Sequence, residues 1–310
     1  MKCTRCGEPA EIALRAHNAS FCRPCFLFWF ERRTLKQIEN EAMFVPGQKL
    51  LVAVSGGKDS LALWELLSRA GHDTLGFHLE LGIDGYSRQS LDRCQAFAEA
   101  RGLRFEVRSL ATANMAVPEM ASATHRPPCA ACGKAKRYYF DQAALEFRCE
   151  VLVTGHNLDD EAARLLGNVL RWREEQLFRQ SPVLESRHPK FVRKVKPFFL
   201  ASEYEIAAYA FMRKIDYQVQ ECPNAAGATQ LTYKRMLDDL EHESPGSKSA
   251  FVGDFLRRGR ANFAEPASRS DGGTCTNCGM PAFHELCSFC SLRREVERKR
   301  TDRNPGREKN

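Results

Sequence analysis

The chain has 310 residues, of which 43% are hydrophobic and 27% charged, as in ordinary soluble proteins. This length accommodates one large α/β domain with smaller modules. No segment approaches the roughly 18–20 apolar residues of a membrane span, and the N-terminus lacks the apolar core of a signal peptide. We therefore expect the protein to be cytoplasmic and to have no contact with a membrane.

The net charge is +7, and the positive excess is uneven. From Arg164 to Lys196, nine Lys and Arg stand against three Glu, and from Ser291 to Asn310 eight stand against four acidic residues. Such clusters favour a polyanionic partner, above all nucleic acid. A solvated basic surface with a disordered tail is the alternative.

The first predicted element is a small zinc module at residues 1–28. The chain has 13 cysteines, and in a reducing compartment cysteines bind metal or carry out chemistry rather than form disulfides. Two C-x-x-C pairs can place four thiolates around one zinc ion. The predicted ligands are Cys3, Cys6, Cys22 and Cys25. The module has almost no core of its own, so the metal would supply its folding energy.

Residues 29–261 follow as a domain in which predicted strands and helices alternate. Apolar runs predict strands at 50–54, 74–79, 103–107 and 151–154. Helical periodicity follows at about 58–70, 87–101, 133–147 and 158–173, and further helices are predicted at 202–214, 228–241 and 249–260. Strands that are apolar throughout and alternate with helices indicate an α/β fold, in which a parallel sheet is covered on both faces.

The corner after the first strand, SGGKDS (55–60), begins a helix. Glycines let backbone N–H groups converge, and the new helix adds unpaired donors and the positive end of its dipole. The corner lies at the carboxyl end of a parallel strand, where α/β sheets bind nucleotides. The Walker spacing is missing, so we predict a different phosphate-binding loop. It would bind through Ser55, Gly56, Gly57, Lys58, Asp59 as a ligand for Mg²⁺, and Ser60.

A second polar corner, TGHNLDD (154–160), follows the strand at 151–154 and should lie at the same edge of the sheet. Gly155 and His156 are expected beside the nucleotide. The adjacent carboxylates of Asp159 and Asp160 could complete the coordination of Mg²⁺ or polarise a nucleophile. One of these aspartates could instead cap the helix that begins here.

A further set of reactive groups is predicted from Cys129, Cys132 and Cys222. Three thiolates without a fourth partner suit an iron–sulfur cluster with one open iron, which could bind hydrosulfide. A cysteine persulfide relay and a three-ligand zinc site are the alternatives. Lys136 and Arg137 lie about one helical turn beyond Cys132, where they could stabilise phosphate charge or form a solvated basic face.

The chain ends in a predicted linker at 262–274, a second zinc module at 275–293 and a basic, disordered tail at 294–310. The predicted zinc ligands are Cys275, Cys278, Cys287 and Cys290. The two remaining cysteines, Cys94 and Cys149, are predicted to be small buried hydrophobic residues.

Several of these stretches resemble a known family. SGGKDS is the signature of the PP-loop ATP pyrophosphatases, which cleave ATP between the α and β phosphates and transfer AMP to a substrate oxygen. Nearly the whole chain is similar to the TtuA/TtcA-type tRNA thiolation enzymes, through both zinc modules and the stretches RPPCAACGKAKRYYF (126–140), TGHNLDDEA (154–162) and ECPNAAGAT (221–229). Zinc modules at both ends favour the TtuA branch and its wobble-uridine relatives, since the TtcA branch is expected to lack them.

The resemblance implies a Rossmann-like parallel sheet of the PP-loop ATPase type, flanked by small zinc modules. It implies ATP-dependent tRNA 2-thiolation, in which uridine O2 is adenylated and sulfur displaces AMP. Mg²⁺ would lie near Asp59 and Asp160. The resemblance assigns catalytic roles to Lys136 and Asp160, and Asp59, as a metal ligand, is the third catalytic candidate. The three cysteines would carry a [4Fe–4S] cluster. The expected partners are tRNA, a ubiquitin-like thiocarboxylated protein or inorganic sulfide as sulfur donor, and a second copy in a homodimer.

Two other classes of function remain open from the sequence. Another PP-loop reaction, such as nitrogen ligation, needs no set of three cysteines, so the iron content would discriminate. A non-catalytic RNA-binding protein built on zinc modules would bind tRNA without converting ATP to AMP.

Overall fold

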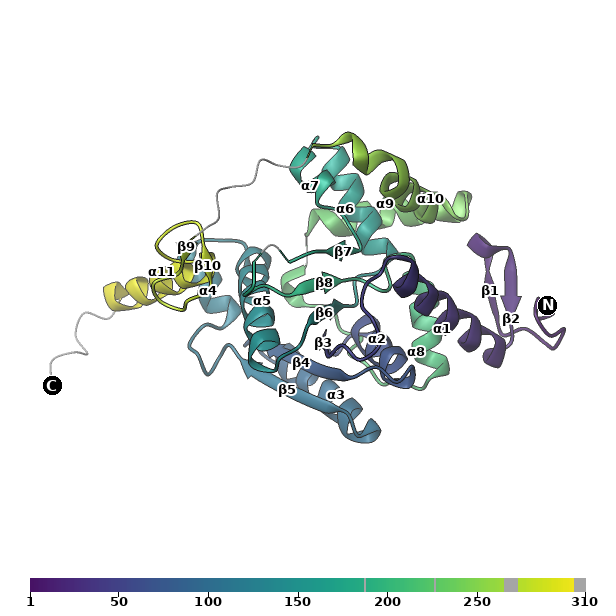
Figure 1. Cartoon of the computed structure of the whole chain (residues 1–310), viewed down its shortest axis with the longest axis horizontal. Coiled ribbons are helices and arrows are strands. Elements are labelled where there is room, and N and C mark those ends of the chain that lie inside the picture. The colour runs from purple at the N-terminus through teal and green to yellow at the C-terminus, as the bar shows by residue number, and fades with distance from the viewer. Residues whose placement is uncertain (187, 226, 265–272, 304–310) are drawn as a thin grey trace.

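A computed structural model describes residues 1–186, 188–225, 227–264 and 273–303. Its centre is a six-stranded sheet (Figure 1). The strands are β3 (Leu50–Ala53), β4 (Thr74–Glu80), β5 (Arg104–Ser109), β6 (Val151–Thr154), β7 (Val183–Leu184) and β8 (Arg193–Val195). Their order across the sheet is β5-β4-β3-β6-β8-β7, and all pairs are parallel except the edge pair β8–β7. The predicted parallel α/β sheet is confirmed.

The order of the strands locates the point at which the chain reverses direction across the sheet. From β3 the chain first adds β4 and β5 on one side and then returns to add β6 on the other. In parallel sheets, ligands bind outside the carboxyl ends of the strands at such a switch point. Ala53 at the end of β3 is in register with Thr154 at the end of β6, so the two polar corners emerge side by side.

Helices cover both faces of the sheet. They are α1 (Arg23–Asn40), α2 (Lys58–Arg69), α3 (Tyr86–Arg101), α4 (Val117–Thr124), α5 (Pro128–Glu146), α6 (Leu158–Val169), α7 (Glu174–Phe178), α8 (Glu203–Met212), α9 (Thr229–Glu243), α10 (Ser247–Asp254) and α11 (Ser288–Arg303). On one face of the sheet, a hydrophobic core packs α1, α2, α3 and α8 against the strands. On the opposite face, a second core does the same for α4, α5 and α11. A third, smaller core holds α6, α7, α9 and α10 together.

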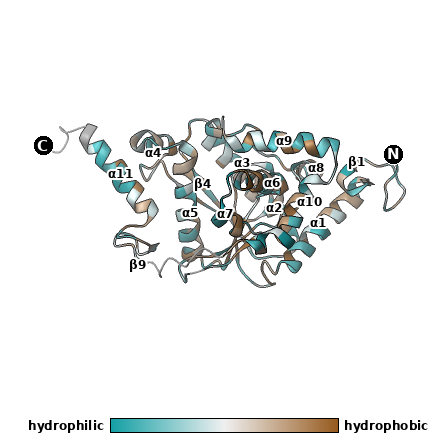
Figure 2. Ribbon diagram, turned by 90° about the horizontal axis from the view of Figure 1, so that it is seen from above, coloured by the Kyte–Doolittle hydropathy of each residue, from teal (hydrophilic) through white to brown (hydrophobic). Residues whose placement is uncertain are grey.

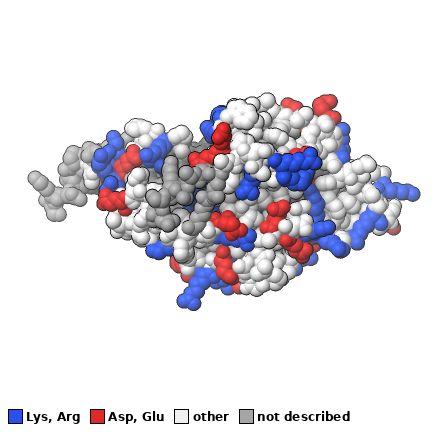
Figure 3. Space-filling view, turned by 45° about the horizontal axis from the view of Figure 1, so that its top comes forward, with Lys and Arg blue, Asp and Glu red and all other residues white. Residues whose placement is uncertain are grey.

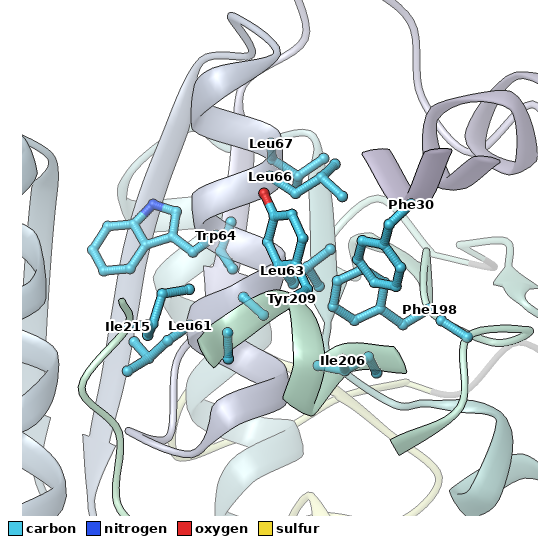
Figure 4. Packing of buried hydrophobic residues seen from close by; sticks show 14 of the residues in the cluster. Phe30, Leu61, Leu63, Trp64, Leu66, Leu67, Phe198, Ile206, Tyr209 and Ile215 are labelled. Carbon is cyan, nitrogen blue, oxygen red and sulfur yellow. The ribbon is translucent and has the colours of Figure 1, made fainter. Parts of the chain in front are cut away.

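Helix α1 fastens the N-terminal module to the central domain. Its buried residues Phe26, Phe30, Thr34 and Ile38 recur every fourth position and therefore form one face of the helix. The ring of Phe30 stacks on that of Tyr209 from α8, with ring centroids 4.8 Å apart (Figure 4). Each large side chain buried in this way stabilises the fold by about 1.5–3 kcal/mol.

The two terminal modules lie at opposite ends of the long axis (Figure 2). The first contains the hairpin β1 (Ile12–Leu14) and β2 (Ala19–Phe21), and the second contains β9 (Gly273–Thr274) and β10 (Pro281–Ala282). None of the described helices is both long and apolar enough to pass through a membrane.

The structure differs from the sequence-based division of the chain at both ends. Helix α1 continues across the predicted boundary at residue 28. The disorder predicted for the tail is wrong for residues 294–303, which continue α11, because Leu292 and Val296 are buried in the core beside α4 and α5. Residues 265–272 of the predicted linker and residues 304–310 of the tail lie outside the described residues.

Candidate active site

The glycine corner between β3 and α2 has the geometry of an anion-binding loop. Gly56 has a φ of +79°, and a Cβ atom there would lie 2.7 Å from the carbonyl oxygen of Ser90, so only glycine fits. Gly57 is the N-cap of α2 and offers no side chain to cap the helix. The first N–H groups of α2 are therefore free of a side-chain cap and available to an anion.

A cavity of about 320 Å³ opens at the switch point, within the size range of ligand pockets. Seven of the predicted site residues line it: Ser55, Asp59, Ser60, Lys136, Gly155, His156 and Asp160. The structure thus brings together residues from three separate segments of the sequence. Gly56, Gly57 and Lys58 belong to the same corner but do not line the cavity.

The corner after β6 packs directly against the glycine corner. A Cβ atom at Gly155 would lie 3.0 Å from backbone atoms of Asp59 and Ser60, which explains the glycine. Asn157 is the N-cap of α6: its side chain accepts the N–H of Asp160 at 2.9 Å, and the Asp160 carboxylate accepts the N–H of Asn157 at 3.4 Å. The hypothesis that an aspartate is the N-cap is wrong, because Asn157 holds that position and Asp160 closes the capping box.

Asp159 and Asp160 are adjacent in sequence but have different surroundings. Asp159 is buried away from the cavity, where it forms an ion pair with Lys248 and accepts the backbone N–H of Glu203 at 2.7 Å. Asp160 lines the cavity. Of the two carboxylates, Asp160 is therefore the one that can reach a ligand.

Three carboxylates meet two lysines beside the glycine corner. The Lys234 ammonium lies 2.6 Å from Asp160 and also pairs with Glu203, and the Lys58 ammonium lies 3.1 Å from Asp59 and 3.9 Å from Glu203. Carboxylate oxygens are the ligands that Mg²⁺ prefers. Asp59 and Asp160 both carry such oxygens, and in this structure each is paired with a lysine.

Burial and neighbouring charges shift the acidities of these groups. Burial raises the pKa of Asp59. Burial acts in the same direction on Asp160, but the ammonium of Lys234 outweighs it, so the pKa of Asp160 is lowered. Burial, with repulsion from Lys196, lowers the pKa of His156 to about 4. His156 is therefore a neutral imidazole at neutral pH.

The three cysteines of the predicted cluster lie in two segments that meet. Cys129 and Cys132 are in the first turns of α5, and Cys222 precedes the 3-10 turn Pro223–Ala225. The thiol of Cys129 lies 3.4 Å from the carbonyl oxygen of Asn224, which joins the two segments. Within the described part of the chain, these sulfur atoms do not converge as tightly as the two terminal sets of four cysteines. Cysteines from two segments that meet are candidates to hold an iron–sulfur cluster, whose thiolates bind separate iron atoms.

Electrostatic coupling links this cysteine set to the cavity. Burial raises the pKa of Cys132, and the positive charge of Lys136, one helical turn further on, opposes that shift. Tyr86 lines the cavity, and its pKa is raised by burial and then by the nearby Cys222. The cysteines therefore adjoin the cavity wall that contains Lys136.

Both predicted zinc sets converge as expected. In each, the four sulfur atoms lie within 4.8 Å of one another. The Cys6 and Cys22 sulfurs are 3.6 Å apart, and those of Cys278 and Cys287 are 3.8 Å apart. Tetrahedral zinc with bonds of about 2.3 Å to sulfur places its ligands roughly 3.8 Å apart, so both sets fit zinc. Cys94 and Cys149 are buried, as predicted.

Sequence reasoning missed His78, Glu203 and Lys234. His78 lines the cavity, and its Nδ1 bonds the carbonyl oxygen of Val54 at 2.9 Å, while its buried Nε2 has no partner among the described residues. A buried polar atom without a protein partner calls for a compensating contact, such as an ordered water or a ligand. His78 is a single polar residue inside an apolar strand pattern, and Glu203 and Lys234 are ordinary helical charges, so only the fold reveals them.

The sheet order, the glycine corner and the cavity at the switch point define a nucleotide-binding α/β protein. The family model of the PP-loop domain matches residues 29–231, and that of the N-terminal LIM domain of the 2-thiouridine synthetase TtuA matches residues 2–27. The chain belongs to the TtuA/TtcA-type tRNA thiolation enzymes of the PP-loop superfamily.

Three known proteins show how far this similarity extends. The tRNA-5-methyluridine(54) 2-sulfurtransferase of Thermus thermophilus is 45% identical over 94% of this chain and 91% of its own. The protein of the same name from Thermotoga maritima is 38% identical over 97% of this chain and 98% of its own. The solved U34-tRNA thiolase NcsA from Methanococcus maripaludis, with its [4Fe-4S] cluster, matches with a TM-score of 0.78 and 25% identity, over 95% of this chain and 96% of its own.

Proposed function

We propose that this protein is an ATP-dependent tRNA 2-thiolation enzyme. One observation carries the proposal: Ser55, Asp59 and Ser60 of the glycine corner line a single cavity with Lys136 and Asp160, and Cys132 and Cys222 pack against the same core as Tyr86 in the cavity wall. Adenylation and sulfur transfer to the same base require these groups to be neighbours. The names of the two bacterial relatives specify 5-methyluridine 54, so we propose the uridine at that position as the target.

The geometry supports adenylation in the cavity. The free N–H groups of α2 and the hydroxyls of Ser55 and Ser60 would hold the ATP phosphates, and Asp59 and Asp160 would hold Mg²⁺. The uridine O2 attacks the α-phosphorus, pyrophosphate leaves, and the N3 proton is released. Lys136 would stabilise the negative charge that develops on the phosphate oxygens.

Sulfur then replaces AMP at C2 of the base. Cys129, Cys132 and Cys222 would hold a [4Fe–4S] cluster, which when bound supplies the sulfur nucleophile. As the C–S bond forms, the bond between C2 and the AMP oxygen breaks, and the proton of the hydrosulfide restores N3–H. The neutral His156 leaves the cavity without a further cationic group at neutral pH.

The remaining elements complete the proposal. The basic stretches and the terminal zinc modules would bind the phosphates of tRNA. The sulfur donor would be a ubiquitin-like thiocarboxylated protein or inorganic sulfide, and the enzyme would act as a homodimer in the cytoplasm.

Nucleoside mass spectrometry tests the function directly. Transfer RNA from a strain that lacks the gene should lose a 2-thiolated uridine, and the purified iron-loaded enzyme with ATP and sulfide should restore it while forming AMP. Unchanged nucleosides in the deletion strain would contradict thiolation. A product that gains nitrogen would indicate the ligase class, and tRNA binding without AMP would indicate a non-catalytic protein.

A further inference from the structure

A second cavity lies at the N-terminal end of the molecule, away from the switch point. Its volume is about 480 Å³, and its walls come from the first C-x-x-C pair, from β2 and from α1. Phe28, Arg32 and Lys36 recur every fourth residue on α1 and line the cavity. This row is two positions out of phase with the buried row that begins at Phe26, so it lies on the opposite side of the helix.

Flat side chains are stacked at the mouth of this cavity. The ring of Phe28 is 43% exposed, and the guanidinium carbon of Arg5 lies 3.8 Å from its centroid. The guanidinium of Arg32 lies 5.8 Å from the same centroid. Arg5 lies inside the first zinc-binding pair, so metal binding would fix its position. The guanidinium of Arg5 lies in contact with this exposed ring and that of Arg32 lies farther away, so a further planar group can stack on the ring or on a guanidinium plane.

The inner wall of the cavity is rigid. The Trp29 ring stacks on Phe21 with centroids 5.3 Å apart and is covered by the guanidinium of Arg33 at 5.2 Å. Arg33 in turn is anchored by Glu205 at 2.8 Å and by the carbonyl oxygen of Leu200 at 2.6 Å. Both anchors belong to the central domain, so the cavity is built across the junction of module and domain and is formed before any ligand binds.

The charge of the cavity has one sign. Its lining includes four cationic side chains and no carboxylate. Arg5, Arg32 and Lys36 form no ion pair with any described residue, whereas Arg33 is paired with Glu205. Lys and Arg side chains also lie on the surface at this end of the molecule (Figure 3). Unpaired cations beside an exposed aromatic ring are complementary to a phosphate that is linked to a planar base.

We propose that this cavity binds an unpaired nucleotide of the tRNA substrate, with its base stacked on Phe28 and its phosphate held by Arg32 and Lys36. The proposal rests on the proposed function, which makes tRNA the substrate. Sequence-tolerant recognition of unpaired RNA relies on stacking against aromatic rings and guanidinium planes, which are the groups found here. An acidic protein would match the charge but has no need of a stacked ring. The cavity would thus position the tRNA while the chemistry takes place at the switch point.

The affinity of the full-length, zinc-loaded enzyme for an in vitro transcribed substrate tRNA tests this site. Loss of one stacked base corresponds to about a tenfold weaker Kd, so we expect that loss for Phe28→Ala and near-normal binding for Phe28→Trp. Binding weakens as salt rises, so the slope of log K against log salt is negative. Arg32→Ala and Lys36→Ala should each reduce the magnitude of this slope by roughly 0.7–0.9, whereas Phe28→Ala should leave the slope unchanged. Phe211→Ala, which removes an 81% exposed ring from α8, is the matched control and should bind normally.

A photo-crosslinking benzoylphenylalanine in place of Phe28 adds a positional test. It should crosslink to an unpaired nucleotide of the tRNA, and a crosslink confined to a paired stem would overturn the proposal. If the wild-type enzyme thiolates tRNA and the Phe28→Ala variant binds tRNA as tightly as the wild type does, this site is overturned and the proposed function is left intact. A changed oligomeric mass or sulfur-donor dependence at unchanged tRNA affinity would assign the cavity to a protein instead. Failure of the wild type itself to bind tRNA would count against the proposed function.

Discussion

Asp59 and Asp160 face one cavity, yet their pKa values shift in opposite directions. Burial is the main cause of the raised pKa of Asp59, because it favours the neutral carboxyl. For Asp160 the ammonium of Lys234 outweighs burial, so the pKa is lowered. A cation bound at the glycine corner would stabilise the charged form of Asp59 and so oppose the effect of burial.

The first prediction removes that charge. Asp59→Asn should reduce AMP formation by about 100-fold, because it deletes a metal ligand at the phosphates without changing the shape of the corner. Binding of tRNA should persist, since the basic surfaces are unchanged. The control is Asp92→Asn on α3, an exposed aspartate that pairs with Arg88 at 2.9 Å. AMP formation by Asp59→Asn at the wild-type rate would remove the nucleotide assignment.

The second prediction concerns stability and pH. Burial favours the neutral forms of Asp160 and Lys234, but their attraction prevails, so the pKa of Asp160 is lowered and that of Lys234 is raised. The Asp160 contribution is present above its unfolded pKa of about 3.9 and is lost as pH falls through the folded value. The Lys234 contribution is present below about 10.4 and is lost as pH rises through its folded value.

Lys234→Met should therefore lower the free energy of unfolding by about 2 kcal/mol at neutral pH, between the values for exposed and fully buried pairs. The difference from wild type should shrink below roughly pH 4. Urea titrations of the zinc-loaded protein without Mg²⁺ across pH measure this difference, with Arg235→Met on the exposed side of α9 as the control. A difference that stays constant down to strong acid would show that the ion pair is not its source.

At the scale of elements, β3, β4, β5 and β6 could be predicted, whereas β8 and β7 on one side of the sheet could not. Leu50–Ala53 and Val151–Thr154 are apolar because both faces are covered. Arg193–Val195 contains two charged residues in three, and it forms a strand only because β6 offers an edge to pair with. Helix α11 was missed for a similar reason, since its charge hides the two apolar residues that dock on α4 and α5.

The candidate site divides in the same way. The glycine corner and the corner at 154–160 could be identified because glycine and polar residues interrupt apolar runs. Glu203 and Lys234 could not, because they come from the surface-like sequences of α8 and α9. Tertiary structure places Glu203 within ion-pair distance of Lys58 in the phosphate loop and Lys234 within ion-pair distance of Asp160 in the second corner.

The third prediction belongs to the terminal modules. Freshly purified protein should contain about two zinc ions per chain, because each set of four sulfurs closes one tetrahedral site. Cys3→Ser should lose one ion and make the β1–β2 hairpin sensitive to proteases, while nucleotide affinity changes little. Elemental analysis and limited proteolysis measure this, and Cys275→Ser should lose the other ion. Zinc contents near zero would contradict both modules.

At the scale of the whole molecule, the site is assembled from segments far apart in the sequence. The cavity uses the ends of β3 and β6, the cysteine pair comes from α5, and the third cysteine arrives after α8. The terminal modules lie at the two ends of this assembly (Figure 1). Such an arrangement lets an RNA contact both ends while its target base enters the middle. Cys222 is the one proposed cluster ligand that comes from the segment after α8, so a bound cluster would link that segment to α5.

The last prediction tests whether Cys222 is a ligand of the cluster. Cys222→Ser should lose its brown absorbance and its iron when the protein is prepared without oxygen, because a serine hydroxyl stays protonated where a thiol is deprotonated by metal, and two cysteines do not retain a four-iron cluster. Zinc content and tRNA affinity should survive, since those groups lie in other segments. Thiolation should stop, while slow AMP formation continues, because the glycine corner and Lys136 are intact.

Cys149→Ser, which alters a buried cysteine outside all three sets, should keep its iron. A Cys222→Ser protein that keeps its iron and thiolates tRNA would exclude the three-cysteine cluster, and thiolation by iron-free wild type would assign the sulfur transfer to a cysteine persulfide.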